Sequence, residues 1–347
     1  MTKWIQQVGP DNDIIISSRI RLARNVEQFP FPIALTKGKS KEVFKVVSHA
    51  ILEGNNPFRN DFDLITLEEI SQMERQVLVE KHLISPNLAT NYEKGAVLLN
   101  KDESVSIMIN EEDHIRIQCL LPGFQLDEAF KVANKMDDVI EEEVKYAFDE
   151  KLGYLTSCPT NVGTGIRASV MVHLPALRMT GYINRILQAA SQIGLAVRGI
   201  YGEGTEFIGN LFQISNQLTL GRNEKDIIGN LKDVTRQIIQ KERDARSTLL
   251  SNNGMQLEDQ IYRSFGILCN ARILSSQECM KLLSNVRLGI DTGILKEIHM
   301  DNINEIMVMT QSAYLQEIAG KPLSSNERDI RRGSLVREKL GNNNICE

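Results

Sequence analysis

Residues 95–122, GAVLLNKDESVSIMINEEDHIRIQCLLP, decide the fold of this chain. Three apolar segments, 95–100, 104–110 and 115–122, follow one another and are joined by Lys101-Asp102 and by the charged link 111–114. Short apolar runs separated by brief polar links are typical of an antiparallel meander. The carboxylates of the second link fall at a strand end, where side chains can face a cleft.

Helical and strand-like segments flank this meander on both sides. Helical spacing predicts helices at residues 41–52, 66–83, 126–148 and 174–193, and Thr66 with Glu69 forms a capping-box pattern at the start of the second. Residues 13–18, 195–200 and 211–220 are predicted strands, and Asn223 is a predicted N-cap of a helix that extends to about Leu250. We therefore expect an α+β fold, an antiparallel sheet flanked by helices.

The best candidate for a domain boundary is the SNNG cluster at residues 251–254, because four turn-forming residues follow a long helix. After it the pattern is helical throughout, at residues 257–268, 276–288, 303–318 and 327–340. The sequence therefore predicts a mixed catalytic domain at residues 13–250 and an all-helical domain at 255–347, which we expect to serve in dimerisation or regulation.

Composition excludes several classes of function. The formal charge of −5 argues against broad nucleic-acid binding, which needs a basic surface.

The first residues lack a basic segment followed by an apolar one, and no apolar stretch approaches the roughly 20 residues that span a bilayer. We expect a cytoplasmic protein. The cysteines form no CxxC pair and the histidines no HxxxH pair, so we expect no metal bound by the protein alone.

Five arginines lie in polar islands of this acidic chain: Arg19, Arg21, Arg116, Arg167 and Arg198. The planar guanidinium stays charged and binds phosphate oxygens in a bidentate manner. The first two are separated by one residue of an expected strand, so both can project to the same face. Taken singly, each could be a surface residue, but their recurrence beside glycines and strand ends favours a phosphate site. The chain has no P-loop, no protein-kinase HRD and DFG motifs and no GxGxxG after a leading strand.

Four islands together resemble the phosphagen (guanidino) kinases. They are SSRIRLARN, NEEDHIR, LTSCPTNVGTGIRASV and RGIYGEGTE with the following QISNQLTLG, and they cover about residues 13–222 in order. The chain resembles the bacterial protein arginine kinases of that family most. The small-molecule kinases carry an N-terminal helical domain for which the first motif, at Ser17, leaves no room, and they lack the helical extension after Gly254. An uncovered site suits an arginine that is still part of a protein.

The resemblance implies the residues of the active site. Glu112 would pair with Glu203 around the substrate guanidinium, whose pKa above about 12 makes it a poor nucleophile until carboxylates orient it and accept a proton. The alternative for residues 111–113 is a solvated hairpin turn. The ATP site would be formed by Ser17, Ser18, Arg19, Ile20, Arg21, His82, Arg116, Arg167, Ala168, Ser169, Val170, Met171, Arg198, Gly199, Ile200, Tyr201, Gly202 and Glu203.

Three assignments have local alternatives. Cys158 lies near Arg167 and before Thr160, so cations and a hydroxyl could stabilise its thiolate for contact with the guanidinium. A buried inert thiol is the commoner fate of a lone cysteine. Met171 stands where small-molecule members often have histidine, so we expect the adenine contacts to differ. His82 could stack on the base or bond to the backbone of its own helix end.

A short segment near the C-terminus resembles the RDxxRA motif that binds phosphoarginine allosterically in protein arginine kinases. It consists of Arg328, Asp329, Ile330, Arg331, Arg332 and Gly333. Gly333 replaces the alanine of the motif. Arg328 and Arg332 lie four residues apart, on one face of an expected helix, as a phosphate clamp requires. A charged exposed helix would explain the segment almost as well.

The resemblance implies an ATP- and Mg²⁺-dependent kinase that phosphorylates arginine residues in proteins by direct in-line transfer. It also implies a role in protein quality control and the stress response: marking proteins for Clp protease degradation, inactivating the heat-shock repressor CtsR, an activator protein as partner and a homodimer formed through the C-terminal helices. One alternative is a kinase of free arginine or another small guanidino compound. A second is a non-catalytic adaptor that binds phosphoarginine.

Overall fold

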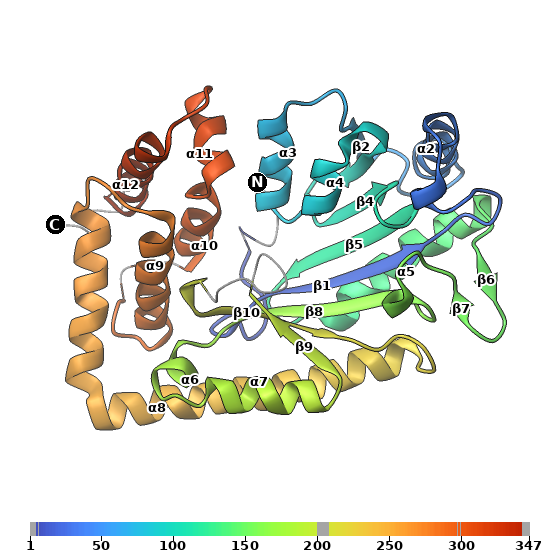
Figure 1. The fold of residues 1–347 in the computed structure, drawn as a ribbon. Coiled ribbons are helices and arrows are strands. Elements are labelled where there is room, and N and C mark those ends of the chain that lie inside the picture. Colours follow the sequence, from blue (N-terminus) through green and yellow to red (C-terminus); the bar gives the residue numbers. More distant parts are fainter. Residues whose placement is uncertain (1–4, 6, 200–207, 297, 299, 342–347) are drawn as a thin grey trace. The chain divides into compact units, whose positions relative to one another are not determined.

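The computed structural model describes residues 5, 7–199, 208–296, 298 and 300–341 (Figure 1). The chain forms two compact units, each built from separate stretches. The first contains Ser17–Val170 and Ser215–Lys232, and the second contains Ile5–Ile16, Met171–Ile214 and the described part of Asp233–Glu347. None of the described helices has the length and hydropathy needed to cross a bilayer.

The main sheet has the strand order β2-β3-β4-β5-β1-β8-β10-β9, and the printed pairs from β2 to β1 are antiparallel. A two-stranded β6-β7 ribbon lies outside it. The expected antiparallel sheet with flanking helices is confirmed. The strands are β1 (Ile15–Arg24), β2 (Phe62–Thr66), β3 (Ala96–Asn100), β4 (Val105–Ile109), β5 (Ile115–Pro122), β6 (Phe148–Asp149), β7 (Gly153–Tyr154), β8 (Ile166–His173), β9 (Leu195–Arg198) and β10 (Leu211–Asn216).

The helices account for most of the remaining regular structure. The α-helices are α2 (Lys37–Leu52), α3 (Gln72–Glu80), α4 (Pro86–Thr90), α5 (Leu126–Glu143), α6 (Pro175–Met179), α7 (Ile183–Gln192), α8 (Glu224–Asn270), α9 (Ser276–Asp291), α10 (Met300–Met309), α11 (Ser312–Ala319) and α12 (Ser325–Gly341). Short 3₁₀ turns are η1 (Pro32–Ala34), η2 (Tyr92–Lys94), η3 (Pro159–Asn161) and η4 (Ile208–Asn210).

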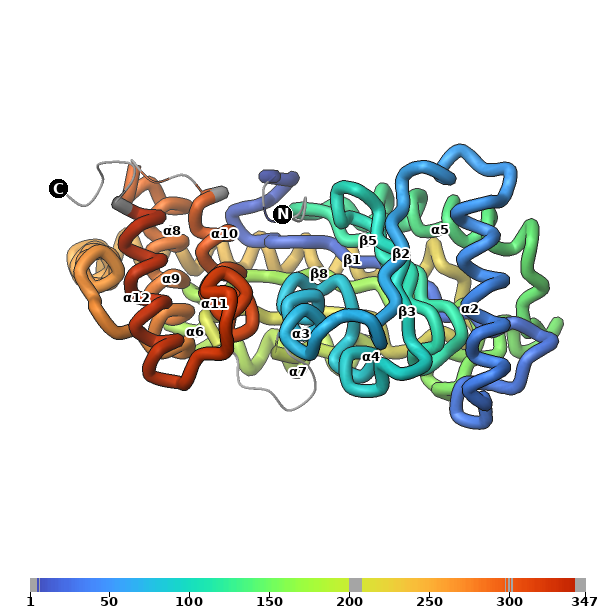
Figure 2. Tube along the Cα trace, turned by 90° about the horizontal axis from the view of Figure 1, so that it is seen from above, coloured from blue at the N-terminus to red at the C-terminus, as the bar shows by residue number. Residues whose placement is uncertain are grey.

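In the first unit the sheet is covered differently on its two faces. One face of the sheet packs against α5 and carries the buried side chains of Ile20 and Leu22 from β1. Arg24 lies on the same face and donates to Asp137 of α5. The other face carries Val97 of β3 and Met108 of β4, which are directly opposed. These two join the cluster formed with α3 and α4, which lie next to each other in Figure 2. The apolar runs in β3 and β4 are thus explained by burial on both faces.

The predicted helix at 66–83 begins too early. Thr66 ends β2, which pairs with β3, and the capping box is formed by Ser71 and Glu74 at the start of α3. Ser71 Oγ accepts from Glu74 N at 3.2 Å, and Glu74 Oε2 accepts from Ser71 N at 2.7 Å. The pattern at Thr66 failed because β-branched residues of 62–66 have a strand partner that lies far along the chain.

Other predicted boundaries also change. The strand predicted at 13–18 continues to Arg24. The strand predicted at 211–220 ends at Asn216, and the one predicted at 195–200 is β9, which ends at Arg198. The helix predicted at 126–148 ends at Glu143, because Val144 is extended. The helix predicted at 174–193 is divided into α6 and α7 at Gly181, whose φ of 76° ends a helical turn. The helix predicted at 303–318 is likewise divided into α10 and α11.

The predicted N-cap at Asn223 is confirmed, since its Oδ1 accepts from Asp226 N at 2.8 Å. The helix that follows runs on to Asn270, and the SNNG cluster lies within it, with Asn253 at non-helical dihedral angles. The turn-forming residues therefore kink α8 and do not end it. The domain division at that point stays a prediction.

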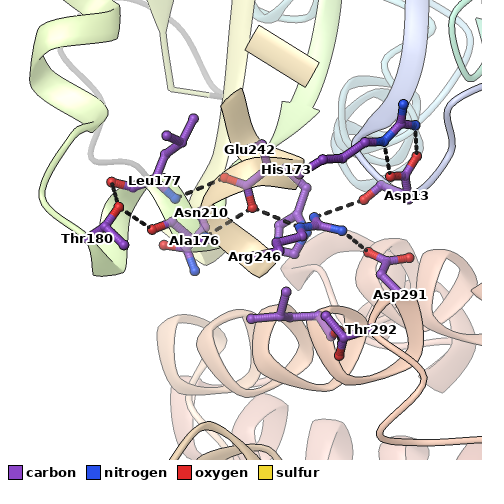
Figure 3. Close-up of polar contacts among 12 residues, drawn as sticks. Asp13, His173, Ala176, Leu177, Thr180, Asn210, Glu242, Arg246, Asp291 and Thr292 are labelled. Atoms are coloured by element: carbon purple, nitrogen blue, oxygen red, sulfur yellow. Dashed lines mark hydrogen bonds and ion pairs between the residues drawn. The ribbon is translucent and has the colours of Figure 1, made fainter. Parts of the chain in front are cut away.

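A buried polar network ties together the elements of the second unit (Figure 3). Glu242 of α8 accepts from the main-chain N–H groups of Ala176 and Leu177 at 3.0 and 2.9 Å, so its carboxylate satisfies the first turn of α6. Arg246 donates to Glu242, to Asp13 O and to Asp291 of α9. The network fixes α6 and α9 against the long helix α8.

Candidate active site

Four arginines of the first unit converge on one face of the sheet, which we call the arginine face. The register of β1 with β5 places Ala23 opposite Arg116. Residues two apart along a strand share a face, and so do directly opposed residues, so Arg19, Arg21 and Arg116 project to the same side. The expectation that the first two share a face is confirmed.

The fourth arginine is supplied by β8. Arg19 Nε donates to Ser169 Oγ at 3.4 Å, which places Ser169 on the arginine face, and Arg167 lies two residues earlier on the same strand. Arg167 is held from behind: Nη1 donates to Asn216 O at 2.9 Å and Nη2 to Asn161 Oδ1 at 3.4 Å. Its guanidinium is therefore fixed in place by neutral groups, and its charge is not cancelled by them.

The charges of these arginines repel one another. Burial, followed by the charges of Arg116 and Arg167, lowers the pKa of Arg19 to about 10. Burial and then the other three arginines lower the pKa of Arg21 well below its ordinary value, and Glu111 opposes them only in part. Arg21 Nε has no hydrogen-bond partner within the described ranges. Collected positive charge that lacks full compensation is suited to binding a polyanion.

Arg24 belongs to the same sequence island but has a structural role. It is 3% exposed, and its Nε and Nη2 donate to Asp137 Oδ2 at 3.1 and 2.6 Å. Its Nη1 donates to the carbonyls of Ala23 and Thr164, and its guanidinium lies 3.5 Å from the ring centroid of Tyr154. A fully paired, buried cation of this kind holds elements together and has no capacity left for a ligand.

The glycines of the CPTNVGTGIRASV island serve close backbone packing. A Cβ at Gly163 would lie 2.6 Å from Thr219 O, and one at Gly165 would lie 2.6 Å from Ala23 O. Both have positive φ, 109° and 65°. These positions require glycine because other chain segments approach them closely. The glycines thereby set the position of β8 and of Arg167 on it.

The three acidic residues of the link 111–113 have different surroundings. Glu111, whose side chain is 2% exposed, pairs with Arg116 at 2.7 Å and accepts from Ser85 Oγ at 2.7 Å. Although burial opposes ionisation, Arg116 and Ser85 hold the pKa of Glu111 below its usual range. Glu112 also pairs with Arg116, at 2.9 Å, but its side chain is 40% exposed. It can therefore meet a cation from solution.

Asp113 is buried and orders the region around the link. Its Oδ1 accepts from Asn25 Nδ2 and from Ser157 N, both at 2.7 Å. Ser157 precedes Cys158, so one carboxylate joins the acidic link to the cysteine island. The link is therefore a fixed turn, unlike the solvated hairpin considered from the sequence. Asp113 was not among the predicted site residues, although its place between two motifs was a signal for it.

Cys158 is half-buried, and its Sγ lies 3.1 Å from Thr160 Oγ1. The predicted hydroxyl neighbour is thus present. Cys119 and Cys279 are buried, as expected for inert thiols.

His82 lies just after α3 with a φ of 61°, and its carbonyl accepts from Gln118 Nε2 at 2.7 Å. Burial, followed by the charge of Arg19, lowers the pKa of His82 to about 3. The imidazole is consequently neutral near pH 7, and it belongs to the surroundings of the arginine face.

Several of the other predicted ATP-site residues do not point their side chains at the arginine face. Ile20, Ala168 and Val170 alternate with the arginines and serine of their strands and are buried on the opposite face. Ser18 Oγ donates to Gly123 O and accepts from Gln125 N, which fixes the entry to α5. Any contact of the first three with a nucleotide would have to involve their main-chain groups. Ser17 is also buried.

The remaining predicted residues fall in the second unit or outside the described ranges. Met171, half-buried, and Arg198, at the end of β9, belong to the second unit with Gly199. Ile200, Tyr201, Gly202 and Glu203 lie outside the described residues, so the pairing of Glu112 with Glu203 stays a prediction.

The C-terminal segment 328–333 lies in α12. Arg332 is 1% exposed and donates to Thr310 O at 2.9 Å, Leu274 O at 2.8 Å and Asp329 Oδ1 at 2.5 Å. Arg328 is half-buried and donates to Leu323 O at 2.7 Å.

The neighbours of this segment in α12 differ in exposure. Ile330 and Arg331 are exposed. A Cβ at Gly333 would lie 2.9 Å from Arg272 O, so the glycine that replaces alanine there matches a close approach of the segment between α8 and α9.

Comparisons with known proteins agree with this geometry. The model of the ATP:guanido phosphotransferase C-terminal catalytic domain matches residues 42–245, and that of the protein-arginine kinase McsB C-terminal domain matches residues 254–345. The chain is 56% identical to the protein-arginine kinase of Halalkalibacterium halodurans over 340 residues, covering 98% of the chain and 95% of that protein. It is 54% identical to that of Bacillus subtilis over 340 residues, covering 98% and 93%.

Solved structures of guanidino kinases share the fold. A crystal structure of lombricine kinase matches with a TM-score of 0.61 and 25% identity, over 70% of this chain and 71% of that one. A duplicated taurocyamine kinase from Schistosoma mansoni matches with a TM-score of 0.60 and 26% identity, over 75% of this chain and 38% of that one. With its arginine face and its two matching domain models, the chain belongs to the ATP:guanido phosphotransferase family and, within it, to the protein-arginine kinases.

Proposed function

We propose that this protein transfers the γ-phosphate of ATP to the guanidinium of arginine residues in proteins. One observation carries the proposal: four arginines with mutually repelling charges lie on one sheet face, and one of them, Arg116, is bonded to the half-exposed carboxylate of Glu112. An anion site and a cation site thus meet at a single residue. That juxtaposition suits a reaction between a triphosphate and a guanidinium.

The arginine face would bind the phosphates of ATP. Burial, and after it the repulsion among the arginines, lowers the pKa values of Arg19 and Arg21, and the negative charge of the triphosphate would relieve that repulsion. Arg167, which donates to Asn216 O and Asn161 Oδ1, would contribute its guanidinium to the same phosphates. Mg²⁺ would arrive with the nucleotide and offset part of its charge. We propose that the neutral imidazole of His82 stacks on the base.

Glu112 would orient the acceptor. Its Oε2 is bonded to Arg116, and the other oxygen of the half-exposed carboxylate is proposed to accept an N–H of the substrate guanidinium. The terminal nitrogen attacks the γ-phosphorus in line. A P–N bond forms, the bond to the β-phosphate oxygen breaks, and that oxygen leaves with the electron pair as ADP. The proton released from the guanidinium passes to a carboxylate, for which we propose Glu112 with Glu203. Cys158 would help to position the guanidinium.

The wider role is also a proposal. The relatives named protein-arginine kinase support proteins as substrates. We propose that modification marks proteins for the Clp protease machinery and inactivates the CtsR repressor, with an activator protein as partner and a homodimer as the assembly. We also propose that residues 328–333 of α12 form a phosphoarginine pocket, in which Arg328 and Arg332 clamp the phosphate. Arg332 would join it only by releasing its present acceptors on Thr310 and Leu274.

The test compares protein and free arginine as acceptors. The protein is incubated with Mg-ATP and either an unfolded protein or free arginine, and products are identified by mass spectrometry under non-acidic conditions that preserve the P–N bond. We expect phosphoarginine in the unfolded protein at a far higher rate than phosphorylation of the free amino acid. Faster modification of free arginine would favour a small-molecule kinase, and phosphate only on serine, threonine or tyrosine would refute the proposal.

A further inference from the structure

A pocket of about 740 Å³ in the first unit includes Glu112 in its lining. Its other walls come from η1, from the segment around α4 and η2, and from Asn110 and Ser157. Pockets of about 300–1,000 Å³ are typical of sites that enclose a whole small ligand. A single guanidinium on Glu112 would leave most of this space unfilled.

One wall of the pocket presents an isoleucine to solvent. Ile33 lies in η1 and is 96% exposed. The segment that carries it is fastened on both sides: Pro30 O lies 3.0 Å from His114 Nε2, and Leu35 is buried with its carbonyl accepting from Lys94 Nζ at 2.6 Å. An apolar side chain is therefore held outward by a fixed backbone.

This wall is anchored to the turn that carries Glu112. His114 Nδ1 accepts from Val26 N at 3.1 Å, so its Nε2 carries the proton and donates to Pro30 O. Burial lowers the pKa of His114 and favours this neutral form. The position of Ile33 is thus tied to the position of the acceptor carboxylate by one histidine of the same link.

A second part of the lining is anchored to the same turn. Asn110 Nδ2 donates to Ser40 O and to Lys94 O of η2, both at 3.0 Å. Asn110 is 7% exposed, and its Oδ1 has no hydrogen-bond partner among the residues that the structure describes. Ser157 Oγ, also in the lining, is likewise without one. Both oxygens are buried, so they could accept the N–H groups of a bound main chain only after a small movement of the lining.

The charge of the lining favours a cationic ligand. Glu111, Glu112 and the exposed Glu93 contribute three carboxylates, and the first two share a single arginine, Arg116, as their ion-pair partner. The one lysine of the lining, Lys94, donates to Leu35 O. An apolar contact, main-chain acceptors and excess negative charge together match an extended peptide that contains arginine.

We propose that this pocket binds the segment of a protein substrate next to the target arginine, with an apolar neighbouring side chain against Ile33 and main-chain groups toward Asn110 and Ser157. The proposal rests on the proposed function, because it takes Glu112 as the group that orients the acceptor. It makes Ile33 a residue that determines which arginines are modified. A free amino acid would leave the same pocket empty.

The test uses two peptides that differ only beside the single arginine, one with leucine and one with serine there. Phosphoarginine formation is followed for the unaltered protein and for Ile33→Ser and Ile33→Leu. The control is Ile273→Ser, because Ile273 is also an exposed isoleucine, at 63%, and does not line the pocket. We expect the unaltered protein to favour the leucine peptide at least about fourfold in kcat/KM, since burial of even one methylene group is worth about 0.8 kcal/mol. The ratio should fall to about one in Ile33→Ser and persist in Ile33→Leu and in the control.

The outcomes separate the two proposals. A preference that persists in Ile33→Ser, or that is absent from the unaltered protein while phosphoarginine forms, would overturn the pocket proposal alone. Phosphoarginine on neither peptide would overturn the proposed function and this inference with it. Loss of activity in Ile33→Ser on both peptides to the same extent, with the ratio unchanged, would count against the pocket as well.

Discussion

Arg21 allows the anion site to be tested through stability and binding together. Replacing it by methionine, which has an unbranched chain of similar length, removes one of four mutually repelling charges. Removing one of several mutually repelling charges relieves that repulsion, and because Arg21 is only half-buried we expect a gain of about 1 kcal/mol. Arg21→Met should therefore melt slightly higher than the unaltered protein when no nucleotide is present.

Mg-ATP should reverse that order. A ligand at 100 times its dissociation constant stabilises a protein by about 2.7 kcal/mol. Loss of one charge-assisted contact costs about 1.5–3 kcal/mol of binding, which weakens the affinity at least about tenfold. The stabilisation by the same nucleotide concentration should then fall to about 1.4 kcal/mol or less in Arg21→Met.

The assay is thermal unfolding with and without Mg-ATP, with ATP affinity measured by calorimetry. The control is Arg59→Met, which removes an exposed arginine of the same unit. It should change neither the melting temperature nor the shift caused by Mg-ATP. A lower melting temperature of Arg21→Met combined with an unchanged shift would refute the argument, because Arg21 would then stabilise the fold and take no part in the anion site.

Three further changes test other parts of the structure. Asp113→Ala leaves two buried donors unpaired and should lower the free energy of unfolding in urea by about 2–4 kcal/mol; a loss below about 0.5 kcal/mol would contradict its bracing role. The pKa of His82 is about 3 in the folded protein and near 6.5 in the unfolded chain, so between these two pH values the unfolded chain binds more protons. The free energy of unfolding should therefore fall as the pH drops from 7 to 5. His82→Asn, which tolerates positive φ, should show a shallower fall in the same urea titrations, and an identical slope would count against a buried neutral imidazole. Gly165→Ala places a Cβ 2.6 Å from a carbonyl at positive φ and should cost about 2 kcal/mol, whereas Gly229→Ala, with open space around it, should cost nothing.

The sequence predicted the sheet well because its signal is local. The apolar runs of β3, β4 and β5 are separated by short polar links, and the structure pairs them in the expected antiparallel order. Helix ends were harder to predict. The pattern at Thr66 and Glu69 resembles a capping box as closely as Ser71 and Glu74 do, and only the pairing of β2 with β3, about 30 residues later, excludes it.

The roles of individual charged residues could not be read from their spacing. Arg19, Arg21 and Arg24 are close in sequence, yet the guanidinium of Arg24 is hydrogen-bonded to Asp137, which lies 113 residues away. Among the carboxylates 111–113, only distant partners such as Ser85 and Ser157 distinguish the half-exposed Glu112 from its buried neighbours. Such distinctions depend on long-range contacts, which a single sequence does not contain.

The central claim is that Glu112 beside the arginine face orients the substrate guanidinium for phosphoryl transfer. The most direct measurement is the rate of phosphoarginine formation on an unfolded protein by Glu112→Gln, with ATP affinity measured on the same sample and Glu69→Gln as an exposed control. We expect Glu112→Gln to form phosphoarginine at least about 100-fold more slowly than the unaltered protein, because the carboxylate that orients the substrate guanidinium is lost. Its affinity for ATP should stay within about threefold of the unaltered value, because the phosphate site is kept. A rate of phosphoarginine formation equal to that of Glu69→Gln would contradict the claim.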